Sequence, residues 1–336
     1  MPAPAVARGP AANSPTRRRA PRPLLVAGIA CLVPPLIGTV LRLVPPRDDA
    51  TALLASFIPY ALLGYVVAAV VSAVALVWPR RRVAAVLTLV SLLGLSLHTA
   101  WTVPFFVPDG RVAASPTFTL LSLNLYKGRA DPDQLVAQGS AADVVVLVEA
   151  TPDALADLAA RGWLDRFPYA AGGADGVQSD TAVYSRYPLR DSELLGTTSF
   201  QQWVTTVETP DAGAVRLMAV HPCNPYCGRG LWASEHAALA RVAAANLDQP
   251  LVVAGDFNAV DDHGPMLDLH RLGLESATDL VGAGWLPTYP ANRPFPPLLP
   301  IDHVLVDDQL TATSIRRVRV AGTDHLGLLT TLARAG

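Results

Sequence analysis

The chain has 336 residues, of which 51% are apolar and only 16% are charged, and its mean hydropathy is +0.32. This apolar excess excludes an intrinsically disordered chain and is too high for an ordinary soluble protein. The formal net charge of −2 conceals an uneven distribution, because residues 1–114 carry a balance of +8 and residues 115–336 a balance of −10. Two regions with different surroundings are therefore expected.

The amino-terminal third contains three apolar runs, at residues 24–44, 52–78 and 83–106. Each run is long enough to cross a hydrocarbon core as a helix, and the second and third contain no charged residue. Buried helices of a soluble protein are the alternative, but three consecutive runs of this length favour membrane spans. The first run has an Arg-rich start and could instead be a signal peptide, although no convincing cleavage site follows it.

Basic residues set the expected orientation of these helices. Arg17, Arg18, Arg19 and Arg22 precede the first run, and the segment 80–82 between the second and third runs is three consecutive Arg. Cytoplasmic loops carry an excess of Arg and Lys, so the amino terminus is expected inside. Residues 1–23 are then a disordered basic cytoplasmic tail and residues 24–107 a multi-pass region of the plasma membrane. Three crossings leave everything that follows outside the cytoplasm.

Residues 108–116 are predicted to be a linker and residues 117–333 one extracytoplasmic domain with its own core. Apolar runs of β character alternate with helical stretches, and many strands follow one another as hairpins, which is typical of a mixed α and β fold. The expected strands are 118–125, 144–148, 182–184, 203–208, 215–220, 251–254, 304–306 and 315–320, and the expected helices are 132–138, 152–161 and 231–247.

Polar side chains occur where these apolar strands begin or end, which predicts that they meet at one rim. They are Asn124, Glu149, His221, Asp256, Asn258, Asp302, Asp324 and His325. Converging carboxylates and amides repel one another unless a cation is present, and oxygen-rich sites suit hard ions such as Mg²⁺ or Mn²⁺. Histidines at the same rim titrate near neutral pH. Together these groups indicate hydrolysis of a phosphoric ester.

The order and spacing of seven short motifs resemble the endonuclease/exonuclease/phosphatase superfamily, whose fold is DNase I-like. The motifs are Leu121–Asn124, Val146–Glu149, Ala182–Pro188, Val220–His221, Gly255–Asn258, Ile301–Val304 and Thr323–His325. The resemblance implies an α+β fold, a four-layer α/β/β/α sandwich of two mixed sheets. The three apolar helices in front make the layout similar to VanJ-type actinobacterial membrane proteins.

The resemblance also implies roles for the rim residues. Glu149, Asn124 and Asp324 match the metal site, and Asp256 and Asn258 match the pair that orients the attacking water. His325 and His221 match catalytic histidines, and Asp302 matches the carboxylate that orients one of them, without indicating which. Arg186 either contacts phosphate or caps its strand. His303 is expected to pack below the site, and His236, His263 and His270 are expected on the surface.

The segment 222–230 directly follows His221 and is expected to border the substrate. Cys223 and Cys227 are predicted to form a disulfide, with free thiols or a metal site as alternatives. Asn224 and Arg229 are candidate substrate-binding residues, and the alternative for Arg229 is a solvated side chain.

The sequence therefore predicts a membrane-anchored, Mg²⁺-dependent hydrolase of phosphoric esters or anhydrides at the outer membrane face, with Mn²⁺ as an alternative metal. The anchor favours a lipid-linked substrate, such as a polyprenyl pyrophosphate or a phospholipid, and no obligate protein partner is evident. One alternative is a surface-anchored nuclease, although the acidic domain offers no basic footprint for nucleic acid. The other alternative is a non-catalytic protein that binds a lipid or a partner.

Overall fold

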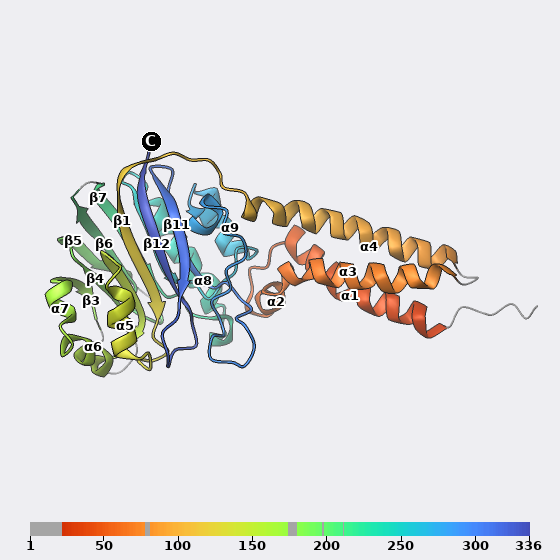
Figure 1. Ribbon diagram of the computed structural model, residues 1–336, viewed down its shortest axis with the longest axis horizontal. Coiled ribbons are helices and arrows are strands. Elements are labelled where there is room, and N and C mark those ends of the chain that lie inside the picture. The colour runs from red at the N-terminus through yellow and green to blue at the C-terminus, as the bar shows by residue number, and fades with distance from the viewer. Residues whose placement is uncertain (1–21, 78–80, 174–179, 197, 211) are drawn as a thin grey trace, which may run out of the picture. The chain divides into compact units, whose positions relative to one another are not determined.

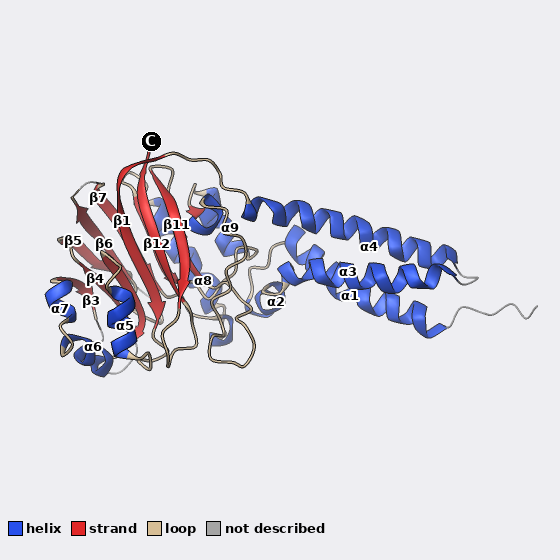
Figure 2. Ribbon diagram, in the orientation of Figure 1, coloured by secondary structure: helices blue, strands red, loops and turns tan. Residues whose placement is uncertain are grey.

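The computed structural model describes residues 22–77, 81–173, 180–196, 198–210 and 212–336 (Figure 1). The predicted tail up to residue 21 and the start of the basic turn, including Arg80, lie outside these residues. The chain divides into two compact units, one of residues 1–37 and 60–97 and the other of residues 38–59 and 98–336. Figure 2 shows that the described part of the first unit is helical and that the strands belong to the second.

The first unit contains α3 (Ala61–Val74), with η2 (Ala75–Val77) extending it, and the larger parts of α1 (Arg22–Leu43) and α4 (Arg81–Thr102). Residues 38–43 of α1 and 98–102 of α4 belong to the second unit. Its small core contains Leu32, Tyr65 and Ala68. Many other apolar side chains of these helices are exposed, which suits a lipid-facing surface better than a water-facing one. Three stretches, Pro23–Leu43, Asp49–Val77 and Arg81–Phe106, are long and apolar enough to cross a membrane.

The second unit contains two six-stranded sheets. The first has the order β11-β12-β1-β2-β4-β3 and the second the order β5-β6-β7-β8-β10-β9. Their strands are β1 (Ala113–Asn124), β2 (Val144–Ala150), β3 (Tyr169–Gly172), β4 (Asp180–Ser185), β5 (Leu189–Leu194), β6 (Trp203–Thr209), β7 (Gly213–Val220), β8 (Leu251–Asp256), β9 (Glu275–Ser276), β10 (Asp302–Val306), β11 (Leu310–Val318) and β12 (Gly327–Ala335). Each sheet has one parallel pair near its middle, β1–β2 and β7–β8, and the remaining neighbours are antiparallel.

The two sheets pack face to face, and helices cover their outer faces (Figure 2). The core between the sheets takes alternate residues of the central strands, such as Val146 and Val252. On the first sheet lie α5 (Pro132–Gly139), α6 (Pro152–Ala159) and α7 (Trp163–Arg166), and on the second lie α8 (Leu231–Ala244) and α9 (Gly264–Arg271). The predicted α/β/β/α sandwich is therefore confirmed.

The remaining short elements are α2 (Asp49–Ala55), η1 (Ile58–Tyr60), η3 (Val103–Phe106), η4 (Pro225–Cys227) and α10 (Ala277–Leu280). Helix α2 belongs to the second unit although it precedes α3 in the chain. Ala52 is fully buried there and joins the core that contains Phe257 and Met266. The first residues of the second predicted apolar run, 52–55, thus form part of the domain that carries the sheets.

The expectation that His236 and His263 lie on the surface is wrong, because their exposed fractions are 2% and 0%. Each ring contacts a backbone carbonyl, of Trp232 and of Ala52 respectively, so a neutral imidazole is accommodated without a charged partner. Burial lowers the pKa of both histidines to about 4. His270 is partly buried between Asp261 and the carbonyl of Leu274.

The buried His236 predicts a loss of stability in mild acid. The pKa of His236 is 6.5 in the unfolded chain and about 4 in the folded chain. Between these two pH values the unfolded chain binds a proton at His236 and the folded chain does not. The stabilising contribution is therefore complete above pH 6.5 and is lost as the pH falls towards 4, by about 2 kcal/mol at pH 5. Between pH 7.5 and 5, the thermal midpoint of the wild type should fall by several degrees more than that of His236→Asn, because carboxylates titrate equally in both proteins. Parallel curves for the two proteins would contradict the assignment.

Candidate active site

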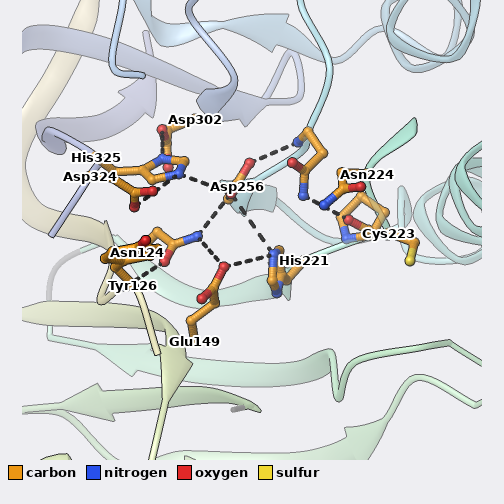
Figure 3. Close-up of polar contacts among 12 residues, drawn as sticks. Asn124, Tyr126, Glu149, His221, Cys223, Asn224, Asp256, Asp302, Asp324 and His325 are labelled. Carbon is orange, nitrogen blue, oxygen red and sulfur yellow. Dashed lines mark hydrogen bonds and ion pairs between the residues drawn. The ribbon is translucent and has the colours of Figure 1, made fainter. Parts of the chain in front are cut away.

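The predicted rim exists, and both sheets contribute to it at the same edge of the sandwich (Figure 3). Asn124 ends β1 and Glu149 lies near the end of β2, the parallel pair of the first sheet. His221 follows β7 and Asp256 ends β8, the parallel pair of the second sheet. Because parallel strands end at a common edge, the two pairs bring four polar side chains together. Asp302 begins β10, opposite Asp256 in the antiparallel register.

Asn124 connects the two sheets at this edge. Its Nδ2 donates to Glu149 Oε1 at 3.2 Å and to Asp256 Oδ2 at 2.9 Å. Its Oδ1 accepts from the Tyr126 backbone N–H at 2.8 Å, which fixes the direction of the amide. The oxygen that the sequence analysis expected to bind metal therefore points away from the carboxylates. Asn124 is placed as a neutral hydrogen-bond donor between two acidic groups.

Glu149 is aimed into the site by an irregularity in its strand. The register between β2 and β4 shifts between Leu147 and Ala150, and Glu149 has a φ of 54°. Such a bulge redirects a side chain, and a left-handed conformation of a non-glycine residue costs about 1 kcal/mol or more. Among the described non-glycine residues, Tyr126, Lys127, Asp191, Arg229 and Asn258 also have a positive φ. All of these except Asp191, which lies in β5, belong to segments that adjoin the site.

Gly255 allows Asp256 and His221 to come close. A Cβ on Gly255, whose φ is 151°, would lie 1.9 Å from the Val220 carbonyl oxygen, so only glycine fits between β7 and β8 here. His221 Nε2 lies 3.9 Å from both Glu149 Oε1 and Asp256 Oδ2. The His221 ring stacks on Phe200 with centroids 4.5 Å apart. This histidine therefore presents Nε2 to the carboxylates from a fixed ring.

Asp302 holds His325, which answers the question that the sequence left open. Asp302 Oδ2 and His325 Nδ1 are 2.8 Å apart and both residues are buried. His325 Nε2 then faces Asp256 Oδ2 at 3.7 Å and Asp324 Oδ1 at 3.9 Å. The ring of Tyr289 packs 5.0 Å from the His325 ring. A carboxylate thus orients the imidazole and leaves its other nitrogen directed at the site.

The pKa values within the cluster are strongly displaced. Burial would lower the pKa of His325, but the charges of Asp302 and Asp256 and the Asp302 hydrogen bond raise it to about 10. Burial raises the pKa of Asp256 to about 6, against the opposing effect of His325. Burial also raises the pKa of Asp324. His325 is therefore an imidazolium at neutral pH, surrounded by acidic groups.

The donor set fits a hard divalent cation. Four carboxylates converge, from Glu149, Asp256, Asp302 and Asp324, and within the described residues no Arg or Lys forms an ion pair with any of them. One carboxylate oxygen of Asp256 and one of Asp302 lie within 4.8 Å of each other. Buried Asp302 Oδ1 has no hydrogen-bond partner in the described part of the chain. Oxygen ligands with excess negative charge are what Mg²⁺ and Mn²⁺ require.

The structure does not bring Arg186 to this site. β4 runs antiparallel to β2, so Asp180 lies at the active-site edge and Arg186 follows the opposite end of the strand. There Arg186 forms an ion pair with Asp143 at 3.0 Å. This placement gives no support to a phosphate contact at the rim, which was one of its two expected roles, because the motif alone does not tell which end of an antiparallel strand faces the site. His303 is buried and contacts the Ala259 carbonyl oxygen at 2.8 Å.

The loop after His221 is closed by a disulfide between Cys223 and Cys227. Pro222 O accepts from Asn258 Nδ2 at 3.0 Å, which joins this loop to the segment after Asp256. Asn224 uses its side-chain oxygen to cap η4 through the Tyr226 N–H. Arg229 is exposed in a left-handed conformation. The loop borders the site, as expected, while its contacts with substrate remain a prediction.

Glu235 is a supporting residue that the sequence analysis missed. It is buried in α8, where Oε2 accepts from the Cys223 N–H at 2.8 Å and Oε1 accepts from the Ser199 N–H at 2.7 Å. It thus holds two loops beside His221. A signal was available, because Glu235 lies in the apolar stripe of its helix with Trp232 and Leu239. A charged residue in such a stripe indicates a buried hydrogen-bonding role.

The model of the endonuclease/exonuclease/phosphatase family matches residues 121–325, more than half of the chain, and these residues contain the whole rim described above. The chain belongs to this family. Members of the endonuclease/exonuclease/phosphatase family hydrolyse phosphoester bonds and typically depend on a divalent metal. No curated protein matches the chain.

Solved structures share the fold. An endonuclease/exonuclease/phosphatase from Beutenbergia cavernae is 20% identical with a TM-score of 0.51, covering 66% of this chain and 72% of its own. A D. rerio TDP2 humanised by 14 mutations is 18% identical with a TM-score of 0.52, covering 65% and 99%. An endonuclease/exonuclease/phosphatase from Bacteroides vulgatus is 16% identical with a TM-score of 0.50, covering 66% and 100%. At these identities the likeness concerns the fold.

Proposed function

We propose that this protein is a membrane-anchored, Mg²⁺-dependent hydrolase of lipid-linked phosphoric esters or anhydrides, acting outside the cytoplasm. The observation that carries the proposal is the convergence of Glu149, Asp256, His221 and the His325–Asp302 pair at one edge, in a chain that also has three apolar helices. Polyprenyl pyrophosphates and phospholipids are the substrates that an anchored site of this kind would meet. Mn²⁺ is the alternative metal.

The proposed chemistry assigns a role to each buried group. Asp256 is held by Asn124 and by the Asn258 N–H at 2.8 Å and is placed to orient the attacking water. The cationic His325 would donate towards a phosphoryl or leaving-group oxygen, and His221 would do so from the opposite side. Glu149, Asp302 and Asp324 would supply oxygen ligands. A bound divalent cation would polarise the phosphoryl group and offset the charge of substrate and carboxylates.

The packing of α2 supports an odd number of membrane crossings. Ala52 lies at the start of the second apolar stretch, yet it is buried in the core of the unit that contains the sheets. This burial is consistent with a loop after the first crossing and a domain after the third that lie on the same side of the membrane. The basic residues before the first helix favour the outer side for both. A disulfide is also typical of an oxidising compartment.

The test is phosphate release by the full-length protein, purified in detergent, from undecaprenyl pyrophosphate with Mg²⁺, Mn²⁺ or EDTA. Plasmid nicking is measured in parallel, and a Glu149→Gln preparation gives the background of contaminating enzymes. Metal-dependent phosphate release that exceeds this background is the expected result.

Two outcomes would replace the proposal. Plasmid nicking without lipid turnover would assign a surface-anchored nuclease. The structure of D. rerio TDP2 in complex with a single-strand DNA product, which shares the fold, is the comparison that favours this alternative. Metal-independent binding of the lipid with no turnover of either substrate would assign a non-catalytic binding protein.

A further inference from the structure

The segment 46–56, which lies between α1 and α3 and overlaps the start of the second apolar stretch, contacts two loops of the active site and is called here the interhelix segment. It contains α2 and lies in the same compact unit as the sheets. Ala52 is its fully buried anchor, in the core with Trp232 and Phe257. A segment that lay on the domain only by chance would not place a side chain inside its core.

The interhelix segment first contacts the loop that follows Asp256. His263 Nε2 and the Ala52 carbonyl oxygen are 2.9 Å apart, and His263 Nδ1 accepts from the Val260 N–H at 3.1 Å. The N–H of Gly264 donates to the Pro46 carbonyl at 3.0 Å. A Cβ on Gly264 would lie 2.8 Å from that carbonyl oxygen, so the two backbones approach as closely as they can. The interhelix segment thus holds His263 and Gly264 directly, and His263 in turn holds Val260.

The second contact is at the start of α8. Gly230 is the N-cap residue and offers no side chain, and Asp49 Oδ2 accepts from the Gly230 N–H at 3.2 Å instead. A carboxylate at a helix N-terminus complements the helix dipole and stabilises the first turn. Asp49 Oδ1 is buried with no hydrogen-bond partner among the described residues. The hydrogen bond to Gly230 is therefore the contact that ties this partly buried carboxylate to the start of α8.

Helix α8 transmits this restraint to the site. Trp232 Nε1 donates to the Asn258 carbonyl at 3.0 Å, and Glu235 holds the Cys223 N–H. Asn258 in turn donates to Asp256 Oδ1 through its N–H and to Pro222 O through its side chain. Two hydrogen bonds, Asp49–Gly230 and Trp232–Asn258, therefore connect the interhelix segment through α8 to the segment of Asp256. The bonds Asp49–Gly230 and Glu235–Cys223 connect it in the same way to the disulfide loop. Outside this network, Arg47 pairs with Asp268 at 2.5 and 2.8 Å.

We propose that the interhelix segment is a positioning element of the active site, with Asp49 and Ala52 as its positioning residues. Through α8 and residues 260–264 it sets the placement of Asn258 and of the Cys223–Cys227 loop, and so substrate binding depends on a segment that lies before the sheets in the chain. The kinetic part of the inference rests on the proposed hydrolase function. The structural part does not.

The structural test measures reduction of the Cys223–Cys227 disulfide by dithiothreitol in the full-length protein, read as alkylated mass. Asp49→Ala removes the acceptor for Gly230, so the loop should open more often and be reduced roughly fivefold faster. Asp49→Asn keeps an acceptor oxygen and should restore the wild-type rate. Asp133→Ala is the matched control, because Asp133 is an exposed carboxylate paired with Arg161, and it should leave the reduction rate unchanged. Arg47→Ala loosens the segment at an exposed ion pair without removing a buried group, and should also speed reduction.

The kinetic test uses undecaprenyl pyrophosphate in the same detergent. Asp49→Ala should raise KM about fivefold while kcat changes less than twofold, because loop placement affects binding more than chemistry. A general loss of fold would lower kcat and the thermal midpoint together, without rescue by Asp49→Asn.

The two failures are distinguishable. Wild-type reduction rates in Asp49→Ala and Arg47→Ala would overturn the positioning role, whether or not the protein hydrolyses the lipid. Absence of lipid turnover in the wild type would overturn the proposed function, while faster reduction in Asp49→Ala would still support the structural inference.

Discussion

Replacing Glu149 with Gln is expected to lower kcat by about a thousandfold, whichever phosphate substrate the enzyme uses. Both carboxylate oxygens accept hydrogen bonds, Oε1 from Asn124 Nδ2 and Oε2 from the Lys127 N–H at 2.9 Å. The amide of Gln can accept only one of the two, and its NH₂ would face another N–H. The change also removes a negative charge from the expected metal ligands, so Mg²⁺ affinity should fall with activity.

Isothermal titration with Mg²⁺ and phosphate release at saturating metal are the two measurements. Glu193→Gln is the matched control, because Glu193 is an exposed carboxylate on β5 and should leave both unchanged. A Glu149→Gln enzyme with wild-type kcat would contradict the placement of the active site. Tighter Mg²⁺ binding by the variant would contradict the metal assignment alone.

Replacing Asp302 with Asn is expected to lower kcat about a hundredfold at pH 8 and to make the rate rise as the pH falls. In the wild type, Asp302 and Asp256 raise the pKa of His325 to about 10, so His325 stays protonated throughout the neutral range. Without the Asp302 charge and hydrogen bond, the pKa of His325 falls, because burial lowers it while the charges of Asp256 and Asp324 continue to raise it. His325 then loses its proton at a lower pH than in the wild type.

The rate between pH 6 and 9 tests this directly. The Asp302→Asn profile should fall towards high pH several times more steeply than the wild-type profile. Asp307→Asn is the control, because Asp307 is a buried carboxylate just beyond the other end of β10 and its pKa is also raised by burial. Parallel profiles of wild type and Asp302→Asn would show that His325 does not act as the proton donor.

The sandwich and most of the rim were predictable because acidic, amide and histidine side chains stand at the ends of largely apolar strands. Asn124, Glu149, His221 and Asp256 all follow runs that are mostly apolar, and the structure brings them together at one edge. The strands that escaped prediction lack such a pattern. β5 is an exposed edge strand with charged residues, and the Leu-Leu-Thr-Thr-Leu of β12 cannot be told from a helical segment by periodicity.

What local pattern could not predict depends on contacts distant in sequence. Asp302 pairs with His325 rather than His221 because β10 begins beside β8, and nothing near Asp302 in the chain encodes that choice. Arg186 belongs to the motif Ala182–Pro188, yet it lies beyond the end of β4 that is remote from the site. His263 looked like a surface residue because its partner, the Ala52 carbonyl, is 211 residues away. Buried polar residues are satisfied by such partners, which spacing along the chain does not reveal.

The burial of Ala52 constrains how the protein is made. Residues 46–56 leave the ribosome before any strand of the sheets, and their core partners, such as Phe257 and Met266, are synthesised about 200 residues later. The early segment must therefore stay without these core partners until most of the domain has been synthesised. A fragment that starts at residue 115 would leave a gap in place of Ala52 and His263 without its carbonyl acceptor. Such a truncated domain should express poorly or aggregate, and its inactivity would say little about the enzyme.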